Sequence, residues 1–153
     1  MAEVQKPFLI VADDVVNAYI VRTLIDVGNN KAYVEAEENY LRIPLMIRRY
    51  QNNHAGEFDY IAVFNANSDD DLEREEKIAM VKNLCRSKKS PENIGVFCFR
   101  DNIQTELHLP RPDNSSLLDL AIALKKNAAE LKQSPTIVEI QKFVDTVTKK
   151  HQE

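Results

Sequence analysis

The most constraining feature of this chain is an apolar run that stops abruptly in short polar and acidic residues. Residues 59–64 read Asp-Tyr-Ile-Ala-Val-Phe, and residues 65–71 read Asn-Ala-Asn-Ser-Asp-Asp-Asp. Such a run predicts a buried strand that leads into a helix, with one of the three aspartates as the helix cap. In open α/β sheets, ligands bind at the carboxyl ends of the strands. The corner around Asn65 and Asn67 is therefore the first place to look for a site.

The two asparagines at this corner lie two residues apart. Successive side chains of a strand point to opposite faces, so residues two apart point to the same side. We therefore expect Asn65 and Asn67 to face one polar cleft.

The other apolar segments predict alternating strands and helices. Further strands are expected at residues 8–11, 31–36 and 94–99, and helices at 16–27, 44–51 and 71–86. This order predicts an α/β three-layer sandwich whose four-stranded sheet is mainly parallel and carries helices on both faces. It also makes the first and third strands neighbours, which brings residues 12 and 13 close to Asn65.

The last third of the chain predicts an extra edge strand and two helices. Residues 103–109 alternate apolar and polar side chains and are followed by prolines, which is typical of an edge strand. Helices are expected from residue 114 or 115 to 131 and from 135 to 149. We divide the chain into a domain at residues 1–133 and a C-terminal helix at 134–153 that packs on the domain or on a partner.

Length and charge narrow the class of protein. A chain of 153 residues favours one domain with a substantial core. Its net charge of -4 opposes strong nucleic-acid binding, which needs clustered Lys and Arg, so any such binding is expected to be weak. No apolar run approaches the roughly 18 residues of a membrane span. We expect a cytoplasmic protein that does not bind membranes, with Cys85 and Cys98 as buried free thiols.

The order of several segments resembles the Toprim domain. This domain is shared by primases, topoisomerases and nucleases related to the overcoming-lysogenization-defect group, and the likeness is greatest to its small stand-alone members. The segments are Phe-Leu-Ile-Val at residues 8–11, Phe-Asn-Ala-Asn-Ser-Asp at 64–69, Ile-Gly-Val-Phe-Cys-Phe-Arg-Asp-Asn at 94–102 and Ser-Leu-Leu-Asp-Leu at 116–120. Together they span roughly residues 6–125 and imply a Toprim-like or Rossmann-like sheet.

This chain departs from the Toprim pattern at the metal-binding positions. In that family the first strand ends in Glu, usually followed by Gly, and the third strand ends in Asp-x-Asp; these carboxylates hold Mg²⁺. Here Ala12 and Asp13 stand in place of the Glu and Gly, and Asn65 and Asn67 replace both aspartates. Mg²⁺ relies on carboxylates to offset its charge, so the resemblance implies a lost metal site with no catalytic residue and no cofactor.

What remains of the Toprim site is a degenerate binding cleft. The residues assigned to it are Ala12, Asp13, Asp14, Asn65, Asn67 and Asp69. The resemblance implies a non-catalytic binding or regulatory partner. We expect it to bind another protein or a second copy of itself, through the edge at residues 103–109 or the C-terminal stripe of Ile137, Ile140, Val144 and Val147.

Two alternatives stay open. The first is a Mg²⁺-dependent nuclease that hydrolyses phosphodiesters with displaced acids; opposing it, these acids stand where helix caps belong. They are Asp13, Asp14, Asp69, Asp70 and Asp71. The second is a pseudo-receiver domain, since residues 8–14 look like the opening of a response-regulator receiver. A receiver needs a phosphorylatable Asp at the end of its third strand, where Phe64 or Asn65 stands.

Overall fold

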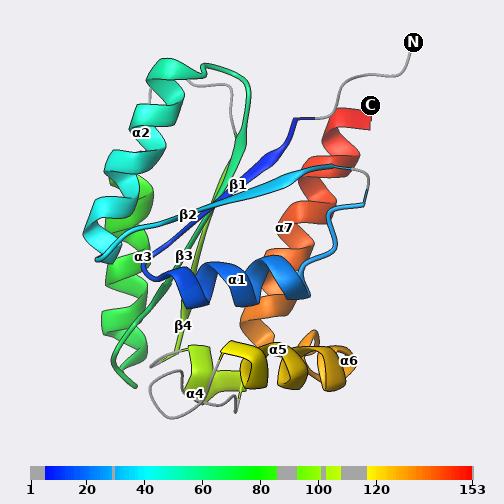
Figure 1. The fold of residues 1–153 in the computed structure, drawn as a ribbon. Coiled ribbons are helices and arrows are strands. Elements are labelled where there is room, and N and C mark those ends of the chain that lie inside the picture. The colour runs from blue at the N-terminus through cyan, green and yellow to red at the C-terminus, as the bar shows by residue number, and fades with distance from the viewer. Residues whose placement is uncertain (1–5, 29, 86–92, 101–102, 108–116, 153) are drawn as a thin grey trace.

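The computed structural model describes residues 6–28, 30–85, 93–100, 103–107 and 117–152. Its centre is an all-parallel sheet with helices on both faces (Figure 1). The strands are β1 (Phe8–Ala12), β2 (Ala32–Ala36), β3 (Asp59–Asn65) and β4 (Ile94–Phe99), in the spatial order β2-β1-β3-β4. The predicted α/β three-layer sandwich with a parallel four-stranded sheet is confirmed.

Helices alternate with the strands as far as β4, and every described element after β4 is a helix. They are α1 (Val15–Leu24), the short 3-10 helix η1 (Tyr40–Arg42), α2 (Ile43–Asn53), α3 (Asp71–Cys85), α4 (Ile103–Leu107), α5 (Leu117–Lys126), α6 (Ala128–Leu131) and α7 (Pro135–Gln152). The expected helix that ends at residue 131 is thus divided into α5 and α6, which meet at Asn127. Among the described residues, we find no helix that is both long and apolar enough to cross a membrane.

Two apolar clusters hold the three layers together. One lies between the sheet and α1, α4, α5, α6 and α7, and it includes Ile10, Ile61 and Phe99. The other lies between the opposite face and α2 and α3, and it includes Leu9 and Tyr60. Neighbouring strand residues therefore enter different clusters, as the alternation of side chains in a strand requires. Burial on both faces explains the nearly continuous apolar composition of β1, β3 and β4.

The connections between strands lead away from β1 on both sides, first to β2 and then to β3. The chain passes from β1 through α1 to β2 at one edge, and then through α2, on the other face, to β3 on the far side of β1. In the parallel pairing of β1 with β3, Ala12 lies opposite Val63. The predicted adjacency of the first and third strands is confirmed, and their carboxyl ends form the switch point of the sheet.

The predicted edge strand at residues 103–109 is wrong: residues 103–107 form helix α4, and residues 108 and 109 lie outside the described part of the chain. Ile103 and Leu107 are four residues apart and both are buried in the core, which fits one face of a helix. The side chain of Glu106 accepts hydrogen bonds from Arg100 N, Ser134 Oγ and Thr136 Oγ1. The sequence here also matches the two-residue period of a strand, so it is the tertiary contacts that favour the helix.

The C-terminal stripe packs against this same chain. Ile137, Ile140, Val144 and Val147 are all buried in the apolar cluster between α7 and the sheet. The Gln141 side chain further ties α7 to the end of α1, since its amide donates to Asp26 O and its carbonyl accepts from Asp26 N. Helix α7 therefore completes the core and does not offer its apolar stripe to a partner.

Gly95 in β4 leaves room for an aromatic pair formed by Phe97 of β4 and Phe143 of α7. A Cβ atom at this position would lie 2.7 and 2.9 Å from Phe97 ring carbons and 3.0 Å from Phe143 Cδ1. The two rings meet edge to face, with centroids 5.8 Å apart. We expect Gly95→Ala to displace these rings and to lower the free energy of unfolding by about 1–3 kcal/mol in urea titrations.

Gly95→Ala in a Phe97→Leu background is the matched control. The smaller and more flexible side chain should relieve the clash, so the added methyl group should cost less there than in the wild type. An equal cost in both backgrounds would contradict a clash with Phe97.

Candidate functional site at the strand ends

A network of hydrogen bonds joins the carboxyl ends of β1 and β3. Asp13 follows β1 directly, and its carboxylate accepts from Asn65 N at 3.1 Å and from Asn17 Nδ2 at 2.7 Å. Asn65 is the last residue of β3, and its Oδ1 accepts from Ile103 N at 2.9 Å. The polar side chains at this corner therefore hold β1, α1, β3 and α4 together.

Burial dominates the electrostatics of Asp13. Loss of solvent raises the pKa of its carboxyl group above 3.8, although the hydrogen bonds from Asn65 N and the Asn17 amide act in the opposite direction. Asn17 is itself buried, and its Oδ1 has no hydrogen-bond partner among the described residues. The Asp13 carboxylate therefore has little contact with solvent and accepts hydrogen bonds from two N–H groups of the fold.

The other aspartates near the strand ends have separate structural roles. Asp14 is the N-cap of α1, since its Oδ1 accepts from Val16 N and Asn17 N. Asp70 Oδ1 accepts from Leu72 N at the start of α3, and Asp71 forms an ion pair with Arg100. Of the three predicted caps of α3, Asp70 takes that role. Asp69 is exposed to solvent.

Ala12 and Asn67 lie differently from the expected cleft. Ala12 is completely buried between its neighbours in the sheet. Asn67 lies beyond the end of β3, with a φ of 54° in the left-handed region, and it is exposed. Because the alternation of side chains applies only within a strand, it does not place Asn67 on the same side as Asn65. Asparagine tolerates this backbone conformation, so Asn67 serves the turn toward α3.

Two cationic side chains that we did not predict at the site reach the strand ends from α3. Lys77 Nζ donates to Ala66 O at 2.5 Å and also pairs with Glu73. Arg74 Nε donates to Cys98 O at 2.9 Å. Residues three apart share a helix face, so the spacing of Arg74 and Lys77 was the available signal.

The oxygen atoms at the ends of β1 and β3 do not form a suitable set of ligands for Mg²⁺. The ion needs several oxygen ligands with one or two carboxylates, but the Asp13 carboxylate is bound by two N–H donors and Asp14 caps a helix. Among the described residues, no three His, Cys, Asp or Glu side chains converge in a way that could hold a metal ion. The ammonium group of Lys77 also lies at the end of β3, where it would repel a cation.

Both cysteines are buried free thiols, as predicted from their positions in apolar patterns. Burial raises the pKa of each thiol to about 12. Since the thiolate is the nucleophilic form, neither Cys85 nor Cys98 is suited to covalent catalysis at neutral pH.

Comparison with known proteins adds no family to this picture: no protein-family model, curated protein or solved structure matches the chain.

Proposed function

We propose that this chain is a catalytically degenerate Toprim-like domain that works as a non-catalytic protein-binding module. One observation carries the proposal: the polar groups at the switch point of the sheet are bonded to the fold's own N–H groups. Asp13 accepts from Asn65 N and the Asn17 amide, and Asn65 accepts from Ile103 N. These side chains are used to fix the corner, so they are poorly placed to exchange a substrate, a metal ion or a proton.

The cations at the same corner support a non-catalytic role. Phosphodiester hydrolysis by a Toprim-like site depends on carboxylates that gather Mg²⁺ at the strand ends. In this chain, Lys77 and Arg74 bond to backbone carbonyls there. A nuclease that used Asp13 and Asp14 would have to break the bonds that hold the start of α1 and the end of β3.

Calorimetric titration with Mg²⁺ and Mn²⁺ tests the lost metal site. We expect the wild type to bind neither ion more tightly than about millimolar and to cleave neither DNA nor RNA, because the corner lacks a convergent set of carboxylates. Asn65→Asp with Asn67→Asp is expected to bind Mn²⁺ more tightly than the wild type, since it adds one carboxylate beside Asp13 and a second in the turn after β3.

Asn65→Asp alone and Asn67→Asp alone are the matched controls. Asn65 lies beside Asp13, whereas Asn67 is exposed in the turn, so Asn65→Asp should account for most of any gain. Micromolar Mn²⁺ binding by the wild type, or metal-dependent cleavage that Asp13→Asn abolishes, would overturn the non-catalytic proposal in favour of the nuclease.

A further inference from the structure

Strand β2 leaves one row of backbone hydrogen-bonding groups without a strand partner. It lies at the end of the strand order and, within the described part of the chain, pairs only with β1. Lys31 O accepts from Phe8 N, and Glu37 N donates to Ala12 O. The odd-numbered residues therefore bond toward β1. Because bonding direction alternates along a strand, the N–H and C=O groups of Ala32, Val34 and Ala36 point outward.

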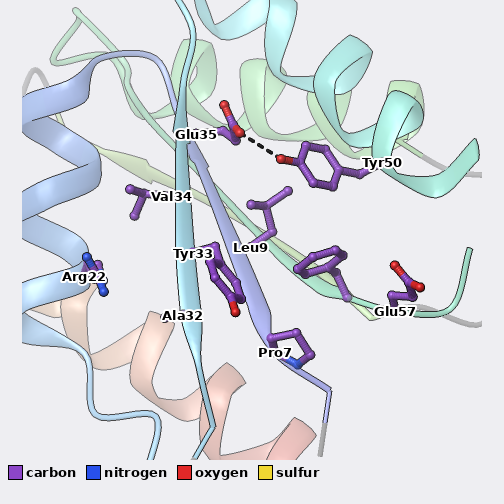
Figure 2. Close-up of a pocket in the computed structure, with 10 residues that line it drawn as sticks. Pro7, Leu9, Arg22, Ala32, Tyr33, Val34, Glu35, Tyr50 and Glu57 are labelled. Atoms are coloured by element: carbon purple, nitrogen blue, oxygen red, sulfur yellow. Dashed lines mark hydrogen bonds between the residues drawn. The ribbon is translucent and has the colours of Figure 1, made fainter. Parts of the chain in front are cut away.

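The side chains along this edge are partly apolar and open to solvent. Tyr33 is 47% exposed and Val34 is 37% exposed. Tyr33 and Glu35 border a groove of about 570 Å³ between β2 and α2, and Figure 2 shows Tyr50 of α2 joined to Glu35 by a hydrogen bond. The Tyr33 ring also packs edge to face on Phe58, with centroids 6.0 Å apart. An open strand edge with apolar side chains is able to accept another strand.

The edge is complementary to itself in an antiparallel arrangement. If Val34 lies opposite Val34 of a second copy, Ala32 lies opposite Ala36, so outward backbone groups meet outward backbone groups along the whole strand. The same register places Lys31 opposite Glu37, once on each side of the two-fold axis, which gives opposite charges across the pair. Val34 meets an apolar copy of itself at the centre.

We propose that β2 pairs antiparallel with β2 of a second copy of this chain, with Val34 on the two-fold axis. The two four-stranded sheets then form one continuous sheet through an isologous interface. This pairing rests on the proposed binding function and gives it a surface and a partner. It replaces the two surfaces expected from the sequence, since residues 103–107 form a helix and the α7 stripe is buried.

Val34→Pro tests the backbone part of the pairing. Proline removes the outward N–H of residue 34 and leaves the β1 bonds of the odd-numbered residues in place, which is why an edge strand tolerates it. In sedimentation equilibrium, we expect the wild type to form a dimer and Val34→Pro to dimerise at least about tenfold more weakly. Val34→Ala keeps the N–H and is the matched control, and circular dichroism checks that each variant is folded.

A charge swap at the same position identifies the second copy and the register. Val34→Lys and Val34→Glu each place like charges opposite each other on the axis, so each variant alone should be monomeric. An equimolar mixture of the two should form a heterodimer, because Lys then faces Glu. Residue 34 is partly exposed, so both variants should fold.

The outcomes separate this pairing from the proposed binding function. A wild type that stays monomeric at every accessible concentration, a dimer that Val34→Pro leaves unchanged, or a Lys and Glu mixture that stays monomeric would overturn the β2 pairing. None of these results restores a metal site, so the non-catalytic proposal would stand or fall on the Mn²⁺ titration and the cleavage assays.

Discussion

Ile140→Ala is expected to lower the free energy of unfolding by about 2–5 kcal/mol, the range for truncating a buried aliphatic side chain. Ile140 is completely buried in the cluster between α7 and the sheet. Removing it leaves a cavity beneath a helix that closes one face of the domain. Since the stability of a domain is typically about 5–15 kcal/mol, this loss is a large fraction of the total. Urea unfolding followed by circular dichroism measures it.

Lys142→Ala is the matched control on the same helix. Lys142 is exposed, so its truncation should change the unfolding free energy by less than about 0.5 kcal/mol. Equal stabilities of the wild type and Ile140→Ala would contradict the packing of α7 on its own domain. Val144 is buried in the same cluster, so Val144→Lys should unfold the protein.

Asp13→Ala is expected to cost about 1–3 kcal/mol of stability, the range for leaving a buried hydrogen-bonding group without its partner. The substitution leaves Asn65 N and the buried Asn17 amide without their acceptor. The ends of β1 and β3 would then lose a bond that joins them at the switch point. Asp69→Ala removes an exposed acid near the same corner and should have little effect. Similar costs for the two variants would contradict the anchoring role of Asp13.

The cost of Asp13→Ala should depend on pH in a defined direction. Burial raises the folded-state pKa of Asp13 above its ordinary value of 3.8, so the folded protein binds this proton more tightly than the unfolded chain. The contribution of Asp13 is therefore greatest below 3.8 and falls as pH rises through the raised folded pKa. Urea midpoints measured between about pH 4 and pH 7 should show a gap between wild type and Asp13→Ala that narrows with rising pH. A gap that widens would show that the hydrogen bonds outweigh burial.

The sequence alone was sufficient for the alternation of strands and helices. The apolar run before Asn65 had the composition of a strand buried on both faces, and Asp70 stood where a helix cap was expected. These signals are local, because they arise from side-chain periodicity and from backbone groups within a few residues. The adjacency of β1 and β3 also followed, since right-handed crossovers in a parallel sheet leave few arrangements of strands.

Whether residues 103–107 form a strand or a helix was decided only by the tertiary structure. Ile103 and Leu107 are compatible both with a strand of period two and with one helical face, and the intervening residues do not decide. The decision comes from Asn65, which accepts a hydrogen bond from Ile103 N across 38 positions of sequence, and from the core that buries both apolar side chains.

The roles of the polar corner residues also depended on long-range contacts. The sequence placed Asp13 near Asn65, but only the folded chain shows that the Asp13 carboxylate accepts from Asn65 N. Lys77 reaches Ala66 O because α3 turns back over the sheet, and a helix pattern alone cannot report such a distance. The sequence by itself determined the alternation of strands and helices as far as β4, and which strand ends meet. The tertiary structure decided the helix at residues 103–107 and the polar groups that bond at the strand ends, because those bonds join residues that only the packing of helices on the sheet brings together.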